Sequence, residues 1–558
     1  MSPPSALRVA CFAAAVAAAA AVGAPSASAA SPRQTVCTVT VNSSDEKEAL
    51  RRALPPERFD FVELVERGRR DWLASACERK VACDVLVVSG HYDGGNEFFP
   101  DSLEKSEYLP VDELERAACS ASCGPLFENL KEVYLFGCNT LNGDAARDVA
   151  GEIGGALRLA GLPAAEVDRV TRKLVARHAE SSRERMRVIF KDVPALYGFS
   201  STAPLGPVAA ANLQRYMAAS GGREFGTGRR SASLLAHFPG GSLIATSGVR
   251  GTDAQAAHRA DVCRFADDDV SAAGRLAFVD ELMHRDVTEV RLFLDRIERA
   301  TQAADAARAL PDVAAAFAQL ANDDEARRRY LAYADRVDDL ATRFRMLALA
   351  RPFGWLTLDE QRDRVAASIE SRLAGGAAST ADVNAVCGLA EGVDDDAGLL
   401  LSTARITTAS LDRPDAAAIA ACLGDPRAHA RMLHALTGDD GDAARFAQVY
   451  LRHRPLADVD DVREVASDIA TMRSPAAQAR ALAVLTEARP TDPATLARLA
   501  EMYPSAATAD VQNAIAGLLL RGDDGALDRV RLAQTLRQYR RNPAGRDLVD
   551  VLIRRLER

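Results

Sequence analysis

Short apolar runs alternate with amphipathic segments through the first half of the chain, from about residue 35 to 250. Six runs rich in β-branched and aromatic residues predict strands, at residues 35–41, 59–65, 84–89, 132–136, 193–199 and 243–246. Helical patterns lie between them, at residues 44–53, 67–79, 111–118 and 144–185. Apolar strands separated by helices are typical of a parallel sheet covered on both faces. We therefore predict a doubly wound, mostly parallel α/β domain over residues 33–262.

The pattern changes at about residue 265, where strand signals cease and helical segments divided by Pro and Gly follow. Ser474-Pro475 and Asp492-Pro493 begin two of these helices, because Ser and Asp cap helix N-termini and Pro suits the first turn. Cys387 and Cys422 lie in similar helical contexts, 35 residues apart, close to the period of paired-helix repeats. We predict an all-α region over residues 265–558, either a HEAT-like array or an irregular helical domain.

The first thirty residues have the pattern of a secretory leader. Arg8 precedes the 16-residue apolar run Val9–Ala24, and the small residues Ala27-Ser28-Ala29 follow Pro25. A run this short and rich in Ala is more typical of a signal peptide, here residues 1–29, than of a retained anchor. No other run is long and apolar enough to cross a bilayer. We expect a periplasmic or secreted protein with no stable membrane span after leader cleavage.

Composition narrows the classes of partner. The 558 residues are 48% hydrophobic and 26% charged, an ordinary composition for a soluble chain with a sizeable core. A net charge of −9 and an aromatic content of 5% argue against a nucleic acid partner, which favours basic stripes and stacking platforms. The sequence predicts neither a cofactor nor a resident metal ion.

Cysteine usage fits an oxidising compartment. Without the leader, which contains Cys11, nine of the ten cysteines remain, and an odd number leaves at least one thiol unpaired. Cys77 with Cys83, and Cys119 with Cys123, lie close enough in sequence to pair locally, although spacing does not decide connectivity. A zinc site at Cys119 and Cys123 is a less favoured alternative, because no second ligand pair completes it.

Two reactive side chains follow consecutive predicted strands. Strand 84–89 leads into Gly90-His91-Tyr92, and strand 132–136 leads into Gly137-Cys138-Asn139-Thr140. Consecutive parallel strands are usually neighbours, about 4.8 Å apart, and reactive groups gather at the carboxyl ends of such sheets. His91 and Cys138 are therefore expected to face each other, where an imidazole assists a thiolate nucleophile. A metal site of His91 with Asp93 and Glu97 is a less favoured alternative.

The two motifs, in this order and spacing, resemble those of the caspase-like cysteine peptidases, which include caspases, gingipains, legumains, separases and bacterial CHAT-domain proteins. The resemblance covers about residues 35–250. It implies His91 as general acid–base, Cys138 as nucleophile, and an oxyanion hole from the backbone of the Gly137–Cys138 turn and of Tyr92.

The resemblance also implies a substrate-binding loop and shows one departure. Ser200, Ser201 and Thr202 would lie near the pocket for the substrate residue that precedes the scissile bond. Tyr92 stands where the family usually has Gly, and its side chain could crowd or reshape the site.

Two classes of function follow. The first is an exported cysteine endopeptidase that acts on peptides or proteins, with the helical region presenting substrates or partners. The second is a caspase-like domain without catalysis, fused to a helical scaffold that binds other proteins.

Overall fold

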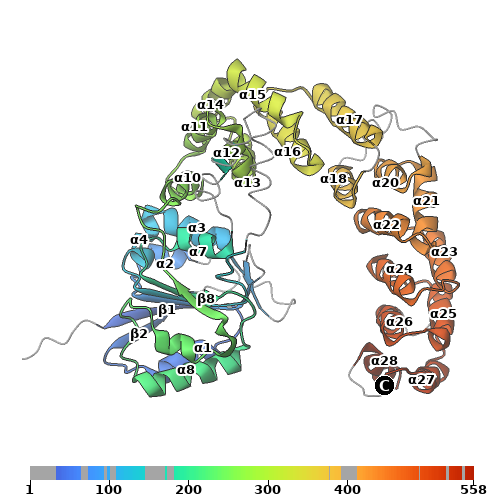
Figure 1. Cartoon of the computed structure of the whole chain (residues 1–558), viewed down its shortest axis with the longest axis horizontal. Coiled ribbons are helices and arrows are strands. Elements are labelled where there is room, and N and C mark those ends of the chain that lie inside the picture. The colour runs from blue at the N-terminus through green and yellow to red at the C-terminus, as the bar shows by residue number, and fades with distance from the viewer. Residues whose placement is uncertain are drawn as a thin grey trace, which may run out of the picture. The chain divides into compact units, whose positions relative to one another are not determined.

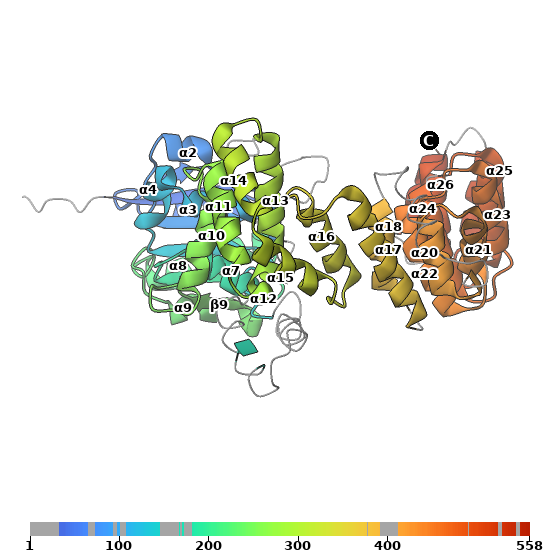
Figure 2. The ribbon, with the colours of Figure 1, turned by 90° about the horizontal axis from the view of Figure 1, so that it is seen from above.

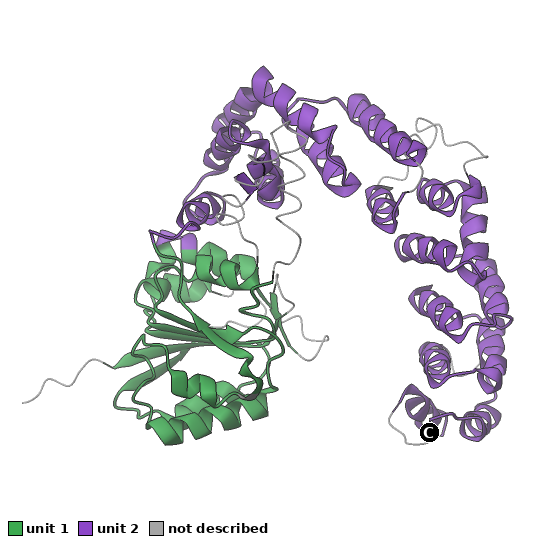
Figure 3. Ribbon diagram, viewed as in Figure 1, with its two compact units in different colours: residues 1–118, 122–144, 181–250 green, residues 119–121, 145–180, 251–558 purple. Residues whose placement is uncertain are grey.

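The computed structural model describes residues 33–64, 73–92, 97–100, 108–144, 167, 170–171, 181–375, 378–390, 411–488, 490–522, 527–542 and 547–557. The predicted leader, residues 1–29, lies outside them. The described residues divide into two compact units (Figure 3). The first ends at Arg250, and the second holds the helices from residue 251 onward together with residues 119–121. The two units therefore divide before helix α10 (Ala256–Ala266), whereas the boundary predicted from the sequence, at residues 262–265, falls inside that helix.

The first unit is built on a six-stranded sheet. Its strands are β1 (Gln34–Thr40), β2 (Phe59–Glu63), β3 (Val85–Ser89), β7 (Glu132–Phe136), β8 (Ala195–Phe199) and β9 (Leu243–Thr246). They lie in the order β2-β1-β3-β7-β8-β9, and all pairs are parallel except β8 with β9, which is antiparallel (Figure 1). The predicted mostly parallel α/β fold is confirmed.

Helices cover both faces of this sheet. They are α1 (Asp45–Ala53), α2 (Ala74–Glu78), α3 (Val111–Cys119), α4 (Gly124–Glu128), α7 (Ser182–Ile189), α8 (Gly206–Ser220) and α9 (Ala232–Ala236), with single turns η1 (Ala121–Cys123) and η2 (Pro239–Gly241). Figure 1 shows α1 and α8 on one face and α2, α3, α4 and α7 on the other. Alternate strand residues enter the two cores, Val85 and Val87 with the first pair of helices and Leu86 and Val88 with the second group. Most of the helical pattern predicted at 144–185 lies outside the described residues.

A small antiparallel sheet follows β3 and was not predicted. It consists of β4 (His91–Tyr92), β5 (Glu97–Phe99) and β6 (Leu109–Pro110). Strands of two or three residues are too short to show a hydrophobic period, so the sequence pattern carries no signal for them. The consequence is that His91 lies on a strand and not in an open loop.

Four disulfides cross-link the chain, Cys37–Cys83, Cys77–Cys123, Cys119–Cys263 and Cys387–Cys422. Local pairing of Cys77 with Cys83 and of Cys119 with Cys123 was wrong, and so was the zinc alternative, because each of these thiols is bonded elsewhere. Neighbours in space decided the pairing. Cys37 lies on β1 beside β3, and Cys83 lies two residues before the start of β3.

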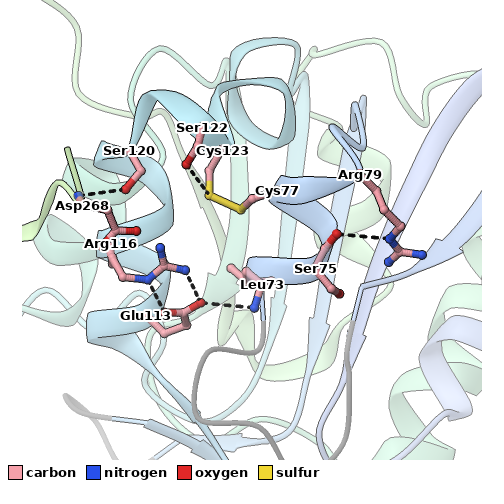
Figure 4. Close-up of a disulfide and its surroundings, with 10 residues drawn as sticks. All are labelled: Leu73, Ser75, Cys77, Arg79, Glu113, Arg116, Ser120, Ser122, Cys123 and Asp268. Carbon is pink, nitrogen blue, oxygen red and sulfur yellow. Dashed lines mark hydrogen bonds and ion pairs between the residues drawn. A yellow bond between two sulfur atoms is a disulfide. The ribbon is translucent and has the colours of Figure 1, made fainter.

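The second of these disulfides joins α2 to η1. Figure 4 shows the Cys77–Cys123 bond beside the buried carboxylate of Glu113, which accepts hydrogen bonds from the Arg116 guanidinium and from the backbone N–H of Leu73. These links fix the helices on one side of the sheet.

The second unit consists of helices. They are α10 (Ala256–Ala266), α11 (Ala272–Met283), α12 (Val287–Leu292), α13 (Leu294–Ala306), α14 (Pro311–Ala321), α15 (Asp324–Ala334), α16 (Leu340–Ala350), α17 (Leu358–Ala374), α18 (Thr380–Ala390), α20 (Pro414–Cys422), α21 (Pro426–Thr437), α22 (Gly441–His453), α23 (Val459–Ile469), α24 (Pro475–Ala488), α25 (Pro493–Met502), η4 (Tyr503–Ser505), α26 (Ala509–Arg521), α27 (Arg529–Gln538) and α28 (Leu548–Leu556).

Towards the C-terminus these helices form two stacked rows. Helices α18, α20, α22, α24, α26 and α28 contact one another in succession, and α21, α23 and α25 form the second row (Figures 1 and 2). Asp492 caps α25 by accepting from the backbone N–H of Thr495, as the Asp-Pro signal predicts. The all-helical region is confirmed. In the described part of the chain, no helix has both the length and the apolar character required to cross a bilayer.

Candidate functional site

The carboxyl ends of β3 and β7 lie side by side. The two strands pair in parallel from Val85 with Glu132 to Ser89 with Phe136, and the Gly90 N–H continues the ladder by donating to the Phe136 carbonyl at 3.0 Å. His91 and Cys138 each stand two residues beyond the last pair. Both residues thus follow the paired strand ends by the same number of residues, which is the basis for expecting them to lie near each other.

Two glycines allow the chains to approach this closely. A Cβ on Gly137 would lie 2.9 Å from the Gly90 carbonyl oxygen and 2.9 Å from the Cβ of Tyr92. A Cβ on Gly90 would lie 3.1 Å from the Cβ of Val41. Carbon atoms do not normally come nearer than about 3.5 Å, so a side chain at Gly137 would push the two strand ends apart.

The side chain of Tyr92 is buried in the core. It is 4% exposed and packs with Leu86 and Val88, with its ring centroid 4.8 Å from that of Phe98. Successive side chains of a strand point to opposite sides, so His91 leaves the strand away from this core. The Tyr92 ring therefore belongs to the core layer.

His91 is held by the small sheet. It pairs with Phe99 across β4 and β5, and the two ring centroids lie 5.4 Å apart. The imidazole is partly exposed. Because the backbone of His91 is part of a paired strand, the point from which its side chain extends is more closely fixed than it would be in a loop.

Cys138 is the free thiol among the cysteines that the structure describes, and it is partly exposed. Its Sγ accepts a hydrogen bond from the backbone N–H of Ala203 at 3.3 Å. Ala203 lies in the loop after β8 and packs against the core on the α1 and α8 face. A backbone donor aimed at sulfur stabilises negative charge there, which is the form in which a cysteine attacks. Sequence reasoning missed Ala203, because only the spatial neighbourhood of β7 and β8 reveals it.

The turn after Cys138 is anchored at several points. Asn139 adopts a left-handed conformation with φ 59°, and its N–H donates to the Ser201 carbonyl at 2.8 Å. The fully buried Thr140 hydroxyl accepts from the Phe199 N–H at 3.0 Å and lies within hydrogen-bonding distance of the Leu135 and Gly137 carbonyls. These bonds tie the cysteine turn to β8 and fix the direction of the sulfur.

In the predicted substrate loop, Ser200 is hydrogen-bonded to the neighbouring chain, whereas Ser201 and Thr202 are exposed. The Ser200 backbone N–H and hydroxyl both donate to the Ser242 carbonyl, at 2.8 and 3.3 Å. Ser201 and Thr202 are exposed, and the Ser201 carbonyl is the acceptor for Asn139. Ser201 and Thr202 therefore border the Cys138 turn with free side-chain surface, whereas Ser200 serves mainly to hold β8 to β9.

A buried carboxyl lies at the end of β3. Glu46 on α1 is 4% exposed, shares a hydrogen bond with the Ser89 side chain, and has no partner at Oε2. Burial raises the pKa of Glu46 above its ordinary value. Ser89 is itself buried and is the last residue of β3, two residues before His91 in the sequence, so the Glu46 carboxyl lies at the strand end that leads to His91.

One further group of possible metal ligands lies in the helical unit. Asp280, His284 and Asp323 bring one ligand atom each to within 4.8 Å of one another. The His284 Nε2 already pairs with the Asp323 carboxylate at 2.7 Å in a half-exposed position, and Gln319 donates to Asp280. An ordinary surface ion pair accounts for this arrangement.

Comparisons with protein-family models, with curated proteins and with solved structures found no match for this chain. A functional proposal therefore rests on the residues at the strand ends. They are a free thiol with a backbone donor at sulfur, an imidazole that follows the neighbouring strand, and glycines that let the two strand ends pack closely.

Proposed function

We propose that the chain is an exported cysteine endopeptidase of caspase-like type, in which His91 and Cys138 form the catalytic dyad. The observation that carries the proposal is the state of Cys138. Eight other cysteines pair in disulfides, yet this thiol stays free at a strand end in register with His91 and receives a backbone N–H. These features support a reactive role for the thiol.

In the proposed reaction His91 takes the proton of the Cys138 thiol, and the thiolate attacks the carbonyl carbon of the scissile peptide bond. The negative charge on the carbonyl oxygen is stabilised by backbone N–H groups of the Gly137–Cys138 turn and of Tyr92. The imidazolium then protonates the leaving amine, which departs and leaves a thioester on Cys138. Water then attacks the thioester carbonyl and gives a proton to His91, the C–S bond breaks to release the carboxylic acid product, and His91 returns the proton to the Cys138 sulfur.

The surroundings support an extracellular or periplasmic setting and a peptide substrate. Four disulfides form and persist only where the compartment is oxidising. Ser201 and Thr202 lie exposed beside the cysteine turn, where they would meet the substrate residue that precedes the cleaved bond. The stacked helices of the second unit would bind protein substrates or partners, since such arrays offer extended surfaces.

Alkylation tests the dyad directly. We expect a substoichiometric peptide electrophile to label Cys138, identified by mass spectrometry, and His91→Ala to slow labelling by roughly 100-fold or more. Cys138→Ala should abolish cleavage in a positional peptide screen. His453→Ala is the matched control, because that imidazole bonds Asn384 at 2.9 Å in the helical unit. Equal, slow labelling in wild type and His91→Ala would instead favour a non-catalytic interaction domain.

A further inference from the structure

Three large apolar side chains are exposed among the described residues of the first unit. They are Tyr108, Leu205 and Val208, with exposed fractions of 38%, 69% and 52%. A single exposed apolar residue is ordinary on a protein surface, whereas exposed apolar groups gathered at one place indicate a binding surface. The positions of these three relative to His91 and Cys138 therefore decide what they mean.

Tyr108 belongs to the small sheet that carries His91. Strand β4 pairs His91 with Phe99 of β5, and β5 pairs Phe98 with Leu109 of β6. Continuing this register by one residue places Tyr108 opposite Phe99, so Phe99 and Tyr108 form an aromatic row that begins beside His91. The His91 and Phe99 ring centroids lie 5.4 Å apart. With strands about 4.8 Å apart, the row extends about 10 Å from the histidine strand.

The two faces of the small sheet have different surroundings. Tyr92, Phe98 and Leu109 lie on one face and are buried in the core of the first unit. The aromatic row lies on the opposite face, where Phe99 is partly exposed and Tyr108 is exposed. The solvent face of an antiparallel sheet is ordinarily polar, so aromatic side chains in this place favour contact with a partner.

Leu205 and Val208 follow the residue that donates to the reactive sulfur. The Ala203 N–H lies 3.3 Å from the Cys138 Sγ, and two peptide units join Ala203 to Leu205, so the Leu205 Cα lies within about 12 Å of the sulfur. The Val208 N–H donates to the Leu205 carbonyl at 2.9 Å in the first turn of α8. An extended peptide advances about 3.3 Å per residue, so this apolar pair is within reach of about four substrate residues.

We propose that the dyad cuts peptide segments with bulky apolar side chains on both sides of the scissile bond. This inference rests on the proposed function, in which His91 protonates the leaving amine. The residues after the scissile bond therefore lie on the His91 side and pack against the aromatic row. The residues before the bond stay on Cys138 as the thioester, and their side chains contact the apolar pair of Leu205 and Val208. Both contacts remove apolar surface from water.

Cleavage of blocked octapeptides by the full chain tests the substrate class. The reference peptide has Leu-Leu-Phe-Phe at its centre. Two comparison peptides replace either the Leu pair or the Phe pair by Gln-Gln, which keeps a long side chain and removes apolar surface. We expect the reference to be cut within its apolar centre, with kcat/KM at least tenfold higher than for either comparison peptide. A ratio below tenfold at either pair overturns the proposal.

Two variants test which residues contact each side of the substrate. Leu205→Gln combined with Val208→Gln should lower the ratio for the Leu pair at least threefold and leave the ratio for the Phe pair unchanged. Tyr108→Gln should do the reverse. A merely structural effect would move both ratios together, so equal changes at both pairs, or none, overturn the assignment. Leu310→Gln is the matched control, because Leu310 is 54% exposed and precedes a proline at the start of α14, in the second unit.

Failure of the dyad can be distinguished from failure of this inference. If wild type cuts none of the peptides and Cys138 is not labelled by the peptide electrophile, the proposed peptidase is wrong. Calorimetric titration of the same three peptides into Cys138→Ala then decides the apolar preference. Binding of the reference at least tenfold tighter than both comparison peptides supports it, whereas a smaller difference, or no binding, overturns it.

Discussion

Gly137→Ala tests whether the two reactive strand ends are as close as described. The added Cβ would meet the Gly90 carbonyl oxygen and the Tyr92 Cβ at 2.9 Å each, and the Thr140 Cγ2 at 3.2 Å. Two of these three atoms belong to the backbone or are fixed to it, so no change of rotamer relieves the contact. Such overpacking typically costs about 1–3 kcal/mol.

The strain should appear in the first unit. For a domain of this size, a loss of about 2 kcal/mol lowers the melting temperature by roughly 4–8 °C. Calorimetry measures that shift, and hydrogen exchange in peptides covering Val85–Ser89 and Glu132–Phe136 shows where it arises. Because the histidine and cysteine chains would move apart, we also expect slower alkylation of Cys138.

The matched control is Gly251→Ala, whose Cβ would meet nothing within 4 Å. We expect this variant to melt and react as wild type does. If Gly137→Ala also melts at the wild-type temperature, with unchanged exchange in both strands, then the close packing of the two strand ends is wrong, and with it the reason for placing His91 beside Cys138.

Three further predictions concern groups around the site and in the helical unit. Thr140→Val removes the acceptor for the buried Phe199 N–H, so the free energy of unfolding measured by urea titration should fall by about 1–3 kcal/mol. The alkylation rate of Cys138 should also change. Thr140→Ser keeps the acceptor and should retain both the wild-type stability and the wild-type alkylation rate. Glu46→Gln should raise the free energy of unfolding at pH 7, because burial holds the pKa of the folded-state carboxyl above its ordinary value of 4.5. The wild type should therefore lose stability as pH rises from 4.5 through that higher pKa, and the variant should show no such decline. Unchanged pH dependence in Glu46→Gln would contradict the burial of that carboxyl. Replacing both Cys387 and Cys422 by Ala opens a 35-residue loop and should cost about 4 kcal/mol, seen as an earlier urea transition, and an unaltered transition would show that the bond does not form.

Much of the α/β framework was readable from the sequence because its central strands β3, β7 and β8 are fully buried. Strand β3 has five buried residues in a row, and so does β7. Each of these strands therefore appears in the sequence as a mostly apolar run, which exposed elements do not show. The predicted bounds at 132–136 and 243–246 agree with β7 and β9. The pairing of β3 with β7, on which the expected juxtaposition of His91 and Cys138 rests, followed from strand order alone. What the pair does stays a prediction.

Features that depend on contacts between distant segments were not readable. The antiparallel β9 has no sequence signal that distinguishes it from a parallel strand. The Ala203 N–H reaches Cys138 across the β7–β8 pairing, and the orientation of Tyr92 depends on the space that Gly137 leaves. Sequence spacing favoured short cysteine loops, whereas sheet register and helix packing decided the bonds.

The disulfides of the first half interlock, and this affects how the protein must mature. Cys77 lies inside the Cys37–Cys83 loop, and Cys119 lies inside the Cys77–Cys123 loop. If the chain is oxidised while it emerges N-terminus first, each cysteine would first pair with a cysteine near it in sequence, which is the wrong partner here. Cys138 also emerges before Cys263, at a time when Cys119 still awaits its partner. We therefore expect efficient maturation to depend on a thiol–disulfide isomerase, which would reverse any bond that Cys119 forms with Cys138 before Cys263 is available.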